Sequence, residues 1–218
     1  MKIFLDTANR ELIKKWLPTG LIDGITTNPS HLSKEGSDVK QVISDICAMV
    51  PGPISVEVVE KTPEAVYAQA KHITTFGEQV VVKIPCASQY FPVIHKLVQE
   101  GVSINVTLVF TPLQALMVAK LGVMLISPFV GRWDDIGVDG FTLLEETVNI
   151  KNLYDFDAEI LAASVRSPLQ WQKIAQLGVD AVTVPPAVFE QAINHPLTEK
   201  GMAIFDADWN KLGVNGSL

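Results

Sequence analysis

Cysteine is scarce in this chain, and so are the features that would send it to a membrane or a secretory route. Only Cys47 and Cys86 occur among 218 residues, and two scattered cysteines give neither a disulfide framework nor a paired-cysteine redox motif. Cys47 lies among apolar residues of an expected helix, so we expect it to pack in the core. No apolar run is long enough to span a bilayer, and Asp6 places an acid too early for a signal peptide. We therefore expect a cytoplasmic protein with reduced thiols.

Positive charge is also sparse. Lys and Arg number 17 against 24 Asp and Glu, which gives a net charge of −7. An acidic chain without a basic run is unsuited to nucleic acids and to anionic membranes, so we expect neither partner. The histidines lie on different expected elements without metal-ligand spacing, and the glycines form no phosphate loop. The sequence thus predicts no metal site.

The chain consists instead of two alternating patterns. Short β-branched runs are typical of buried strands, and the amphipathic stretches between them have the 3.6-residue period of helices. Gly101, Gly122 and Gly178 each follow a helical stretch, where a left-handed residue ends a helix. Pro112 and Pro168 stand where a helix would begin. The expected strands are Lys2–Asp6, Gly24–Asn28, Ile54–Val59, Gln79–Ile84, Ser103–Phe110, Met124–Val130, Glu159–Ser164 and Ala181–Val184.

Eight such strands separated by helices favour a (β/α)₈ barrel. The strands are apolar over most of their length, as in parallel sheets that helices cover on both faces. A doubly wound open sheet is the alternative, but it usually has a glycine-rich turn after its first strand, where Asp6–Asn9 stands here. With 48% apolar residues and no linker, we expect one barrel domain over residues 1–218, with a further short helix near 205–212.

Polar side chains follow or end most of the expected strands. In a barrel, catalytic groups gather at the carboxyl ends of the strands, and side chains two apart in a strand share a face. Burying several polar groups together is costly unless they pair or carry out chemistry. The candidate site residues are the polar residues Asp6, Thr26, Asn28, Glu57, Lys83, Asn105, Thr107, Ser127, Arg132, Ser164 and Arg166, together with the aromatic residue Phe129.

Lys83 is the strongest candidate among them. It follows three apolar strand residues, and desolvation favours the neutral amine that can attack a carbonyl and form a Schiff base. The alternative is a lysine that reaches solvent beside a structural carboxylate. Glu57 and Asp6 are candidate proton carriers, although either could pair with Lys83, and Asp6 could instead cap a helix. Arginines after the sixth and seventh strands suit phosphate binding, or are ordinary surface residues.

Together these residues resemble the transaldolase family, in its short subfamily that also includes fructose-6-phosphate aldolases. The match extends in register from Met1 to about Trp209. The motifs that carry it are Phe4–Ala8, Asp23–Ser30, Val82–Pro85, Asn105–Phe110, Ser127–Arg132 and Ala162–Arg166.

The resemblance implies a role for each site residue. Lys83 matches the Schiff-base lysine, Glu57 the carboxylate that works through a water, Thr107 a hydroxyl that holds this water, and Asp6 the base for the C4 hydroxyl. The remaining matches concern substrate binding. Asn28, Asn105 and Ser127, with Thr26 beside them, match the residues around the dihydroxyacetone part, and Arg132, Ser164 and Arg166 match the phosphate site.

The implied reaction transfers dihydroxyacetone from fructose 6-phosphate or sedoheptulose 7-phosphate to erythrose 4-phosphate or glyceraldehyde 3-phosphate in the pentose phosphate pathway. It needs no metal or organic cofactor. The subfamily also implies a homo-oligomeric ring, often two pentamers, with the C-terminal helix crossing to a neighbour.

Two positions separate the branches of this family. Aldolase-type members carry glutamine where Glu57 stands and tyrosine where Phe129 stands, so this chain has the transaldolase pattern. A phenyl ring cannot donate the hydrogen bond that would help release free dihydroxyacetone. The alternatives are a fructose-6-phosphate aldolase and a non-catalytic barrel that only binds sugar phosphates. The chain departs from the family pattern at His31, at Cys86–Phe91 and at Trp133.

Overall fold

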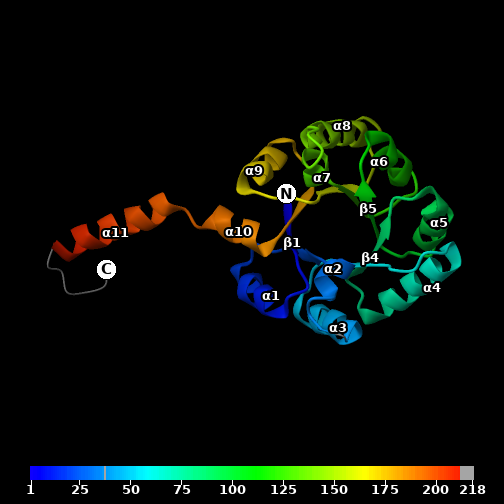
Figure 1. The fold of residues 1–218 in the computed structure, drawn as a ribbon, viewed down its shortest axis with the longest axis horizontal. Helices are drawn as coiled ribbons and strands as arrows, with labels where there is room; N and C mark the ends of the chain where they lie inside the picture. Colours follow the sequence, from blue (N-terminus) through cyan, green and yellow to red (C-terminus); the bar gives the residue numbers. More distant parts are fainter. Residues whose placement is uncertain (37, 212–218) are drawn as a thin grey trace.

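The computed structural model describes residues 1–36 and 38–211. Its strands are all parallel and close into a barrel in chain order, with the last strand paired to the first (Figure 1). The (β/α)₈ prediction is therefore confirmed. The strands are β1 (Lys2–Asp6), β2 (Gly24–Thr26), β3 (Ile54–Glu57), β4 (Val80–Pro85), β5 (Ile104–Val109), β6 (Leu125–Pro128), β7 (Glu159–Ala162) and β8 (Ala181–Val184).

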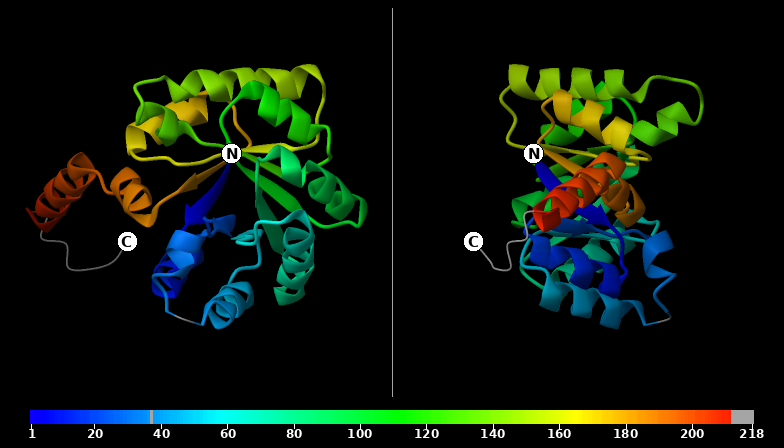
Figure 2. Two further views of the ribbon diagram at one scale, coloured as in Figure 1. Left: turned by 45° about the vertical axis from the view of Figure 1, so that its right-hand side comes forward. Right: turned by 90° about the vertical axis from the view of Figure 1, so that its left-hand side faces the viewer.

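Helices form a ring around the strands (Figures 1 and 2). The α-helices are α1 (Arg10–Trp16), α2 (Pro29–Leu32), α3 (Val39–Met49), α4 (Pro63–Ile73), α5 (Phe91–Gln99), α6 (Pro112–Ala119), α7 (Val130–Asp134), α8 (Gly140–Leu153), α9 (Pro168–Gln176), α10 (Pro186–Ile193) and α11 (Pro196–Lys211). Short 3₁₀ turns are η1 (Leu17–Thr19), η2 (Thr74–Phe76) and η3 (Ser88–Tyr90).

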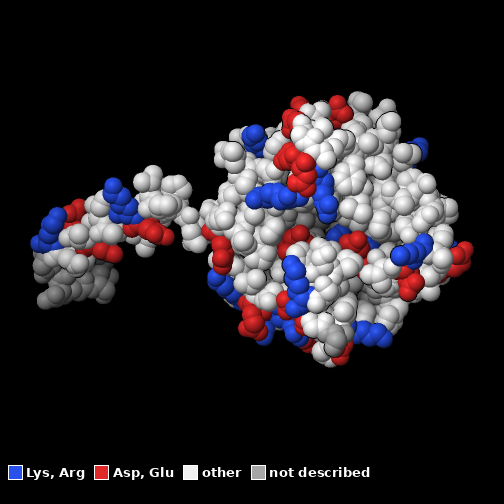
Figure 3. All heavy atoms as spheres, viewed as in Figure 1, with Lys and Arg blue, Asp and Glu red and all other residues white. Residues whose placement is uncertain are grey.

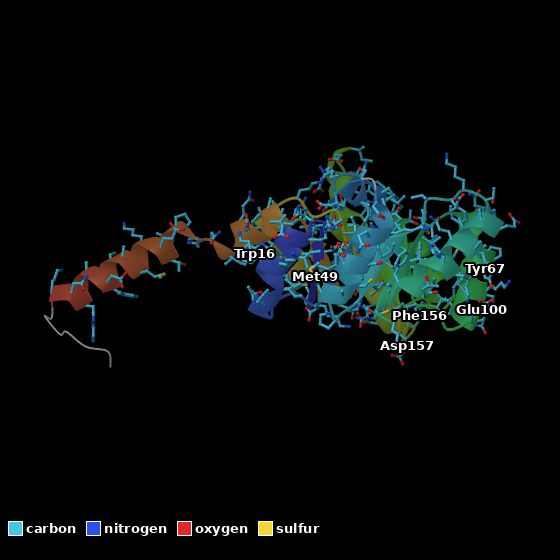
Figure 4. The ribbon with its side chains drawn as sticks, turned by 90° about the horizontal axis from the view of Figure 1, so that it is seen from below. Trp16, Met49, Tyr67, Glu100, Phe156 and Asp157 are labelled. Atoms are coloured by element: carbon cyan, nitrogen blue, oxygen red, sulfur yellow. The ribbon has the colours of Figure 1, made fainter. Side chains whose placement is uncertain are left out.

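The helix boundaries follow from local chemistry. Pro112 and Pro168 are the first residues of α6 and α9, where proline loses no hydrogen bond. Gly101 and Gly178 have φ of 78° and 73°, the left-handed region that ends a helix after α5 and α9. Neighbouring helices are also linked at the surface, since Tyr67 of α4 donates to Glu100 at the end of α5 at 2.8 Å (Figure 4).

A small apolar cluster inside the barrel supports the site. Its members come from β1, β4, β6, β7 and β8, and strands on different sides of a closed barrel can meet only in its interior. The cluster is Phe4, Val81, Leu125, Leu161 and Ala181. Asp6, Lys83, Ser127 and Thr183 stand two residues further along their strands and so point inward as well. The polar side chains therefore lie next to the apolar cluster inside the barrel, one inward-facing position closer to the carboxyl ends of the strands.

Helix α11 stands clear of the barrel beyond α10 (Figures 1, 2 and 4). None of its residues is buried, and Leu197 and Phe205 are 68% and 74% exposed. The helix begins earlier than the predicted 205–212, because His195 Nδ1 accepts from the backbone of Leu197 and Pro196 is the first helical residue. Residue 212 of that prediction lies outside the described residues. Among the described helices, none is long and apolar enough to cross a membrane.

Candidate active site

A cavity of about 190 Å³ opens at the carboxyl ends of the strands. It contains most of the predicted site residues; Glu57, Asn105 and Thr107 lie outside its lining, on the neighbouring strands β3 and β5. Thr183 and Ala163 were not predicted. The lining residues are Asp6, Thr26, Asn28, Lys83, Ser127, Phe129, Arg132, Ala163, Ser164, Arg166 and Thr183.

Lys83 is buried at the edge of this cavity, with only 6% of its surface exposed. Its Nζ lies 3.0 Å from Glu57 Oε2 and donates to the backbone carbonyl of Thr27 at 3.1 Å. Glu57 and Lys83 are register partners on β3 and β4, so their side chains leave the sheet on the same side. The amine therefore does not reach bulk solvent, and the pairing with Glu57 gives it a carboxylate within proton-transfer distance.

Asn105 and Ser127 form a fully buried hydrogen-bonded chain beside the lysine. Ser127 Oγ donates to Asn105 Oδ1 at 2.7 Å, and Asn105 Nδ2 donates to Ser55 Oγ at 3.0 Å. These bonds set which way the Asn105 amide faces. Ser55 was not predicted, although its position two residues before Glu57 on β3 puts it on the inward face.

Thr107 carries an unsatisfied hydroxyl. Its Oγ1 is buried and has no hydrogen-bond partner among the described residues. An unsatisfied buried polar group costs about 1–3 kcal/mol. Thr107 lies on β5 opposite Pro85, at the end of the strand that carries Lys83. A water or a substrate hydroxyl placed there would remove this cost.

Asp6 is held by polar neighbours from two other elements. Thr26 Oγ1 donates to its Oδ1 at 2.9 Å and also contacts Thr183 Oγ1 at 2.6 Å, while His31 Nε2 lies 3.4 Å from the same Oδ1. Burial raises the pKa of Asp6, but the hydrogen bond and charge of His31, the charge of Lys83 and the bond from Thr26 together hold it below 3.8.

Asp6 does not cap helix α1, so the helix-capping alternative for this residue is wrong. Asn9 caps α1 instead, since its side chain accepts from the backbone N–H of Leu12 at 2.9 Å. Asn28, another predicted site residue, does cap a helix: its Oδ1 accepts from His31 N at 2.9 Å at the start of α2. This leaves the amide nitrogen of Asn28 for a ligand.

Arg132 and Arg166 come to the cavity from α7 and from the segment after β7. Both Nη atoms of Arg166 pair with the Asp135 carboxylate at 3.0 and 2.8 Å. A guanidinium that holds a carboxylate by one edge keeps a second edge of N–H donors. On the face that Figure 3 presents, basic and acidic side chains lie close together over the middle of the barrel.

Ser164 adopts a backbone conformation that is rare for serine, with φ of 63°. Gly131 lies directly beneath it: a Cβ there would be 2.2 Å from the Ser164 carbonyl oxygen and 2.9 Å from Arg166 Nε. The glycine therefore allows the segment that carries Ser164 and Arg166 to approach α7. This close approach was not predicted from the sequence.

Phe129 lines the cavity and packs edge-on against Phe110, with ring centroids 5.9 Å apart. Trp133 donates its indole N–H to the Phe110 carbonyl at 3.1 Å. The departure noted at Trp133 thus fixes the end of β5 next to Phe129. As for cations, no group of three or more His, Cys, Asp or Glu side chains able to hold a metal occurs in residues 1–36 and 38–211.

The family model described as Transaldolase/Fructose-6-phosphate aldolase matches residues 3–215. A protein of Maridesulfovibrio salexigens named Probable transaldolase is 47% identical over 212 residues, covering 97% of this chain and 99% of its own. A protein of the same name from Methanococcus maripaludis (strain C5) is 45% identical over 96% of this chain and 97% of its own.

Solved structures that resemble the chain share its fold at low sequence identity. 3-Hexulose-6-phosphate synthase from Salmonella typhimurium superposes with a TM-score of 0.66 at 16% identity, covering 88% of this chain and 92% of that one. A flavocytochrome b2 variant gives 0.59 at 15% identity, over 85% and 56%. Because one barrel serves such different chemistries, these similarities show the fold alone. The match to the family model and the relatives at about 45% identity show more: the chain belongs to the transaldolase/fructose-6-phosphate aldolase family.

Proposed function

We propose that this protein is a transaldolase that works through a Schiff base on Lys83. It moves a dihydroxyacetone unit from fructose 6-phosphate or sedoheptulose 7-phosphate to erythrose 4-phosphate or glyceraldehyde 3-phosphate, as a cytoplasmic enzyme of the pentose phosphate pathway. The observation that carries the proposal is the buried amine of Lys83, 3.0 Å from Glu57 at the edge of a cavity that also holds Asp6 and two arginines.

Imine formation begins when Lys83 Nζ, having passed a proton to Glu57, attacks the C2 carbonyl of the ketose. The resulting carbinolamine must lose its hydroxyl group as water. Glu57 returns a proton to that hydroxyl through a water held by Thr107, whose own Oγ1 has no partner among the described residues. Loss of water leaves a protonated imine, which is an electron sink for the next step.

Carbon–carbon cleavage then starts at Asp6, which takes the proton of the C4 hydroxyl. The C3–C4 bond breaks, its electrons move into the imine, and an aldose phosphate leaves while the three-carbon enamine stays on Lys83. A second aldose phosphate accepts the enamine carbon, and Asp6 returns its proton to the new hydroxyl. The same steps in reverse release the product ketose.

The other predicted residues bind substrate in this scheme. Ser127, Asn28 and Thr26 line the cavity and hold the dihydroxyacetone hydroxyls, and the buried amide of Asn105 supports this part of the site from behind Ser127. The phosphate is held by Arg132, Ser164 and Arg166, which all line the cavity. Arginine donors suit a phosphate because they bind it through two N–H groups at once.

Phe129 favours transfer over simple cleavage. Its ring lines the cavity and has no hydroxyl to deliver a proton to the bound enamine. The intermediate therefore waits for an acceptor aldehyde. A fructose-6-phosphate aldolase, the other activity in the family description, would instead release dihydroxyacetone without an acceptor.

We further propose that copies of the chain assemble into a homo-oligomeric ring, and that two such rings stack into a decamer. Leu197, Met202 and Phe205 of α11 are more than half exposed in the isolated chain, and a second copy would cover them. Light scattering of the full chain, and of a chain that ends at Asn194, tests this: the shorter chain is expected to have a lower mass.

Trapping with borohydride tests the chemistry. Fructose 6-phosphate and borohydride are expected to leave a three-carbon adduct on Lys83 in peptide mass spectra, and Lys83→Met is the matched control. A folded protein without the adduct would contradict the Schiff base. Sugar-phosphate binding that survives in Lys83→Met, with no adduct in the unsubstituted protein, would support a non-catalytic barrel. Comparing dihydroxyacetone release with and without erythrose 4-phosphate separates transfer from aldol cleavage.

A further inference from the structure

Asp6 has both of its polar side-chain partners on the same carboxylate oxygen. Thr26 Oγ1 donates to Oδ1 at 2.9 Å, and His31 Nε2 approaches that oxygen to 3.4 Å. Oδ2 accepts no hydrogen bond from any residue within 1–36 and 38–211. A carboxylate that is anchored through one oxygen presents the other, and Oδ2 is the oxygen left to receive a substrate proton.

The backbone holds His31 in place for this contact. Its N–H donates to the side chain and to the carbonyl of Asn28, at 2.9 and 3.0 Å, so the histidine belongs to the capped first turn of α2. The side chains of His31 and Asp6 are 25% and 21% exposed. The pair is therefore partly open to solvent, and Asp6 also lines the cavity.

His31 acts on Asp6 through its imidazole, whose Nε2 lies 3.4 Å from Oδ1. Imidazole is the side chain that ordinarily changes charge between pH 5 and 8. The Nε2–H of a neutral imidazole can already donate to Asp6, and protonation adds a positive charge to this contact. The charged side chains nearby are Lys83 of β4, its partner Glu57 of β3, Arg132 of α7, Arg166 after β7 and Glu35 after α2.

We propose that His31 is a positioning residue that keeps the Asp6 carboxylate ionised and its Oδ2 turned toward the substrate, which extends the reaction into mildly acidic solution. The inference rests on the proposed transaldolase chemistry, in which Asp6 must be ionised to take the C4 hydroxyl proton. Burial favours the protonated form of the Asp6 carboxyl, and the His31 imidazole 3.4 Å from Oδ1 opposes that protonation.

The sign of the effect follows from the groups that act on Asp6. Burial raises the pKa of Asp6, and the hydrogen bond and charge of His31 are the largest influences that lower it. Removing His31 therefore raises the pKa of Asp6, and the acidic limb of the kcat profile moves to higher pH. A neutral donor at residue 31 would keep the hydrogen bond and lose the charge. The midpoint of the acidic limb in such a variant should therefore lie between those of the unsubstituted protein and of a variant without a donor.

The test is the pH profile of kcat for transfer from fructose 6-phosphate to erythrose 4-phosphate, in the full-length protein and three variants. His31→Leu removes donor and charge, His31→Gln keeps a neutral donor, and His72→Gln on the outer helix α4 is the control. We expect the midpoint of the acidic limb to rise by about one pH unit in His31→Leu, by less in His31→Gln and not at all in the control.

Two outcomes would overturn the inference. Coincident midpoints would mean that His31 does not act on Asp6, and a lower midpoint in His31→Leu would mean that the imidazolium competes with substrate for the carboxylate. Borohydride trapping at pH 7.5 separates this from the proposed function. An adduct on Lys83 in every protein, with coincident limbs, removes only the role of His31, whereas no adduct in the unsubstituted protein removes the Schiff-base reaction itself.

Discussion

Replacing Gly131 by alanine should weaken phosphate binding through a single added methyl group. The new Cβ would lie 2.2 Å from the Ser164 carbonyl oxygen and 2.9 Å from Arg166 Nε, and Cβ atoms essentially never approach other atoms within 3.0 Å. Ser164 already has a φ of 63°, so its backbone has few alternatives that relieve the overlap. The segment that carries Ser164 and Arg166 must therefore move away from α7.

The size of the effect follows from the cost of overpacking. Forcing an extra methyl group into a packed contact typically costs about 1–3 kcal/mol, which corresponds to about a 5- to 150-fold loss if it falls on binding. Since the displaced groups belong to the proposed phosphate site, we expect kcat/KM to fall by this factor with glyceraldehyde 3-phosphate as the acceptor. With unphosphorylated glyceraldehyde it should change much less.

The assay compares these two acceptors in Gly131→Ala and in Gly201→Ala. Gly201, on the exposed helix α11, has no atom within 4 Å of an added Cβ, so the second variant controls for a glycine-to-alanine change without a steric clash. Melting temperatures of both variants show whether the cost falls on folding instead. Equal kcat/KM for both acceptors in Gly131→Ala, with an unchanged melting temperature, would refute the reasoning.

Three other predictions concern single side chains. Phe129→Tyr should raise the release of free dihydroxyacetone from fructose 6-phosphate in the absence of an acceptor, and an unchanged product partition would contradict our account of that ring. Thr107→Val should slow imine formation by about 100-fold or more, the usual contribution of positioned proton transfer, and rapid-quench trapping with borohydride measures the rate. The melting temperature should not fall, because the lost hydroxyl has no protein partner among the described residues. Burial raises the pKa of the Cys86 thiol from 9.0 to about 11, so iodoacetamide at pH 8 should modify it at least tenfold more slowly than free cysteine, and equal rates would contradict this.

Much of the site could be predicted because the carboxyl ends of all strands in a parallel barrel meet at one end of it. A residue's place along its strand therefore indicates whether it can reach the site. Asp6, Lys83 and Ser127 lie near the carboxyl ends of different strands, and the closed sheet brings them to one cavity. Thr183 could have been found in the same way, since it stands two residues after Ala181 on an inward-facing strand. It was missed because a lone threonine within an apolar strand has no distinctive pattern.

The remaining features depended on contacts between segments far apart in the chain. Asp135, which follows α7, pairs with Arg166, which follows β7, and His31 of α2 contacts Asp6 of β1. In neither pair does the place of one residue in the sequence predict its partner. The early start of α11 was missed because its first turn is organised by the side chain of His195 rather than by an apolar period. Nothing in a local pattern specifies such pairs.

The sequence by itself determined the order of strands and helices around the barrel, the boundaries of the strands to within a few residues, and the inward face that carries Lys83. Those properties come from local propensity and from the two-residue period of strands, which act over short stretches of chain. The tertiary structure decided that Thr26 and His31 contact the same oxygen of Asp6. It also decided that the Thr107 hydroxyl has no partner among the described residues and that residue 131 has no room for a Cβ. These depend on distances of a few ångströms between separate elements, and only closure of the barrel sets such distances.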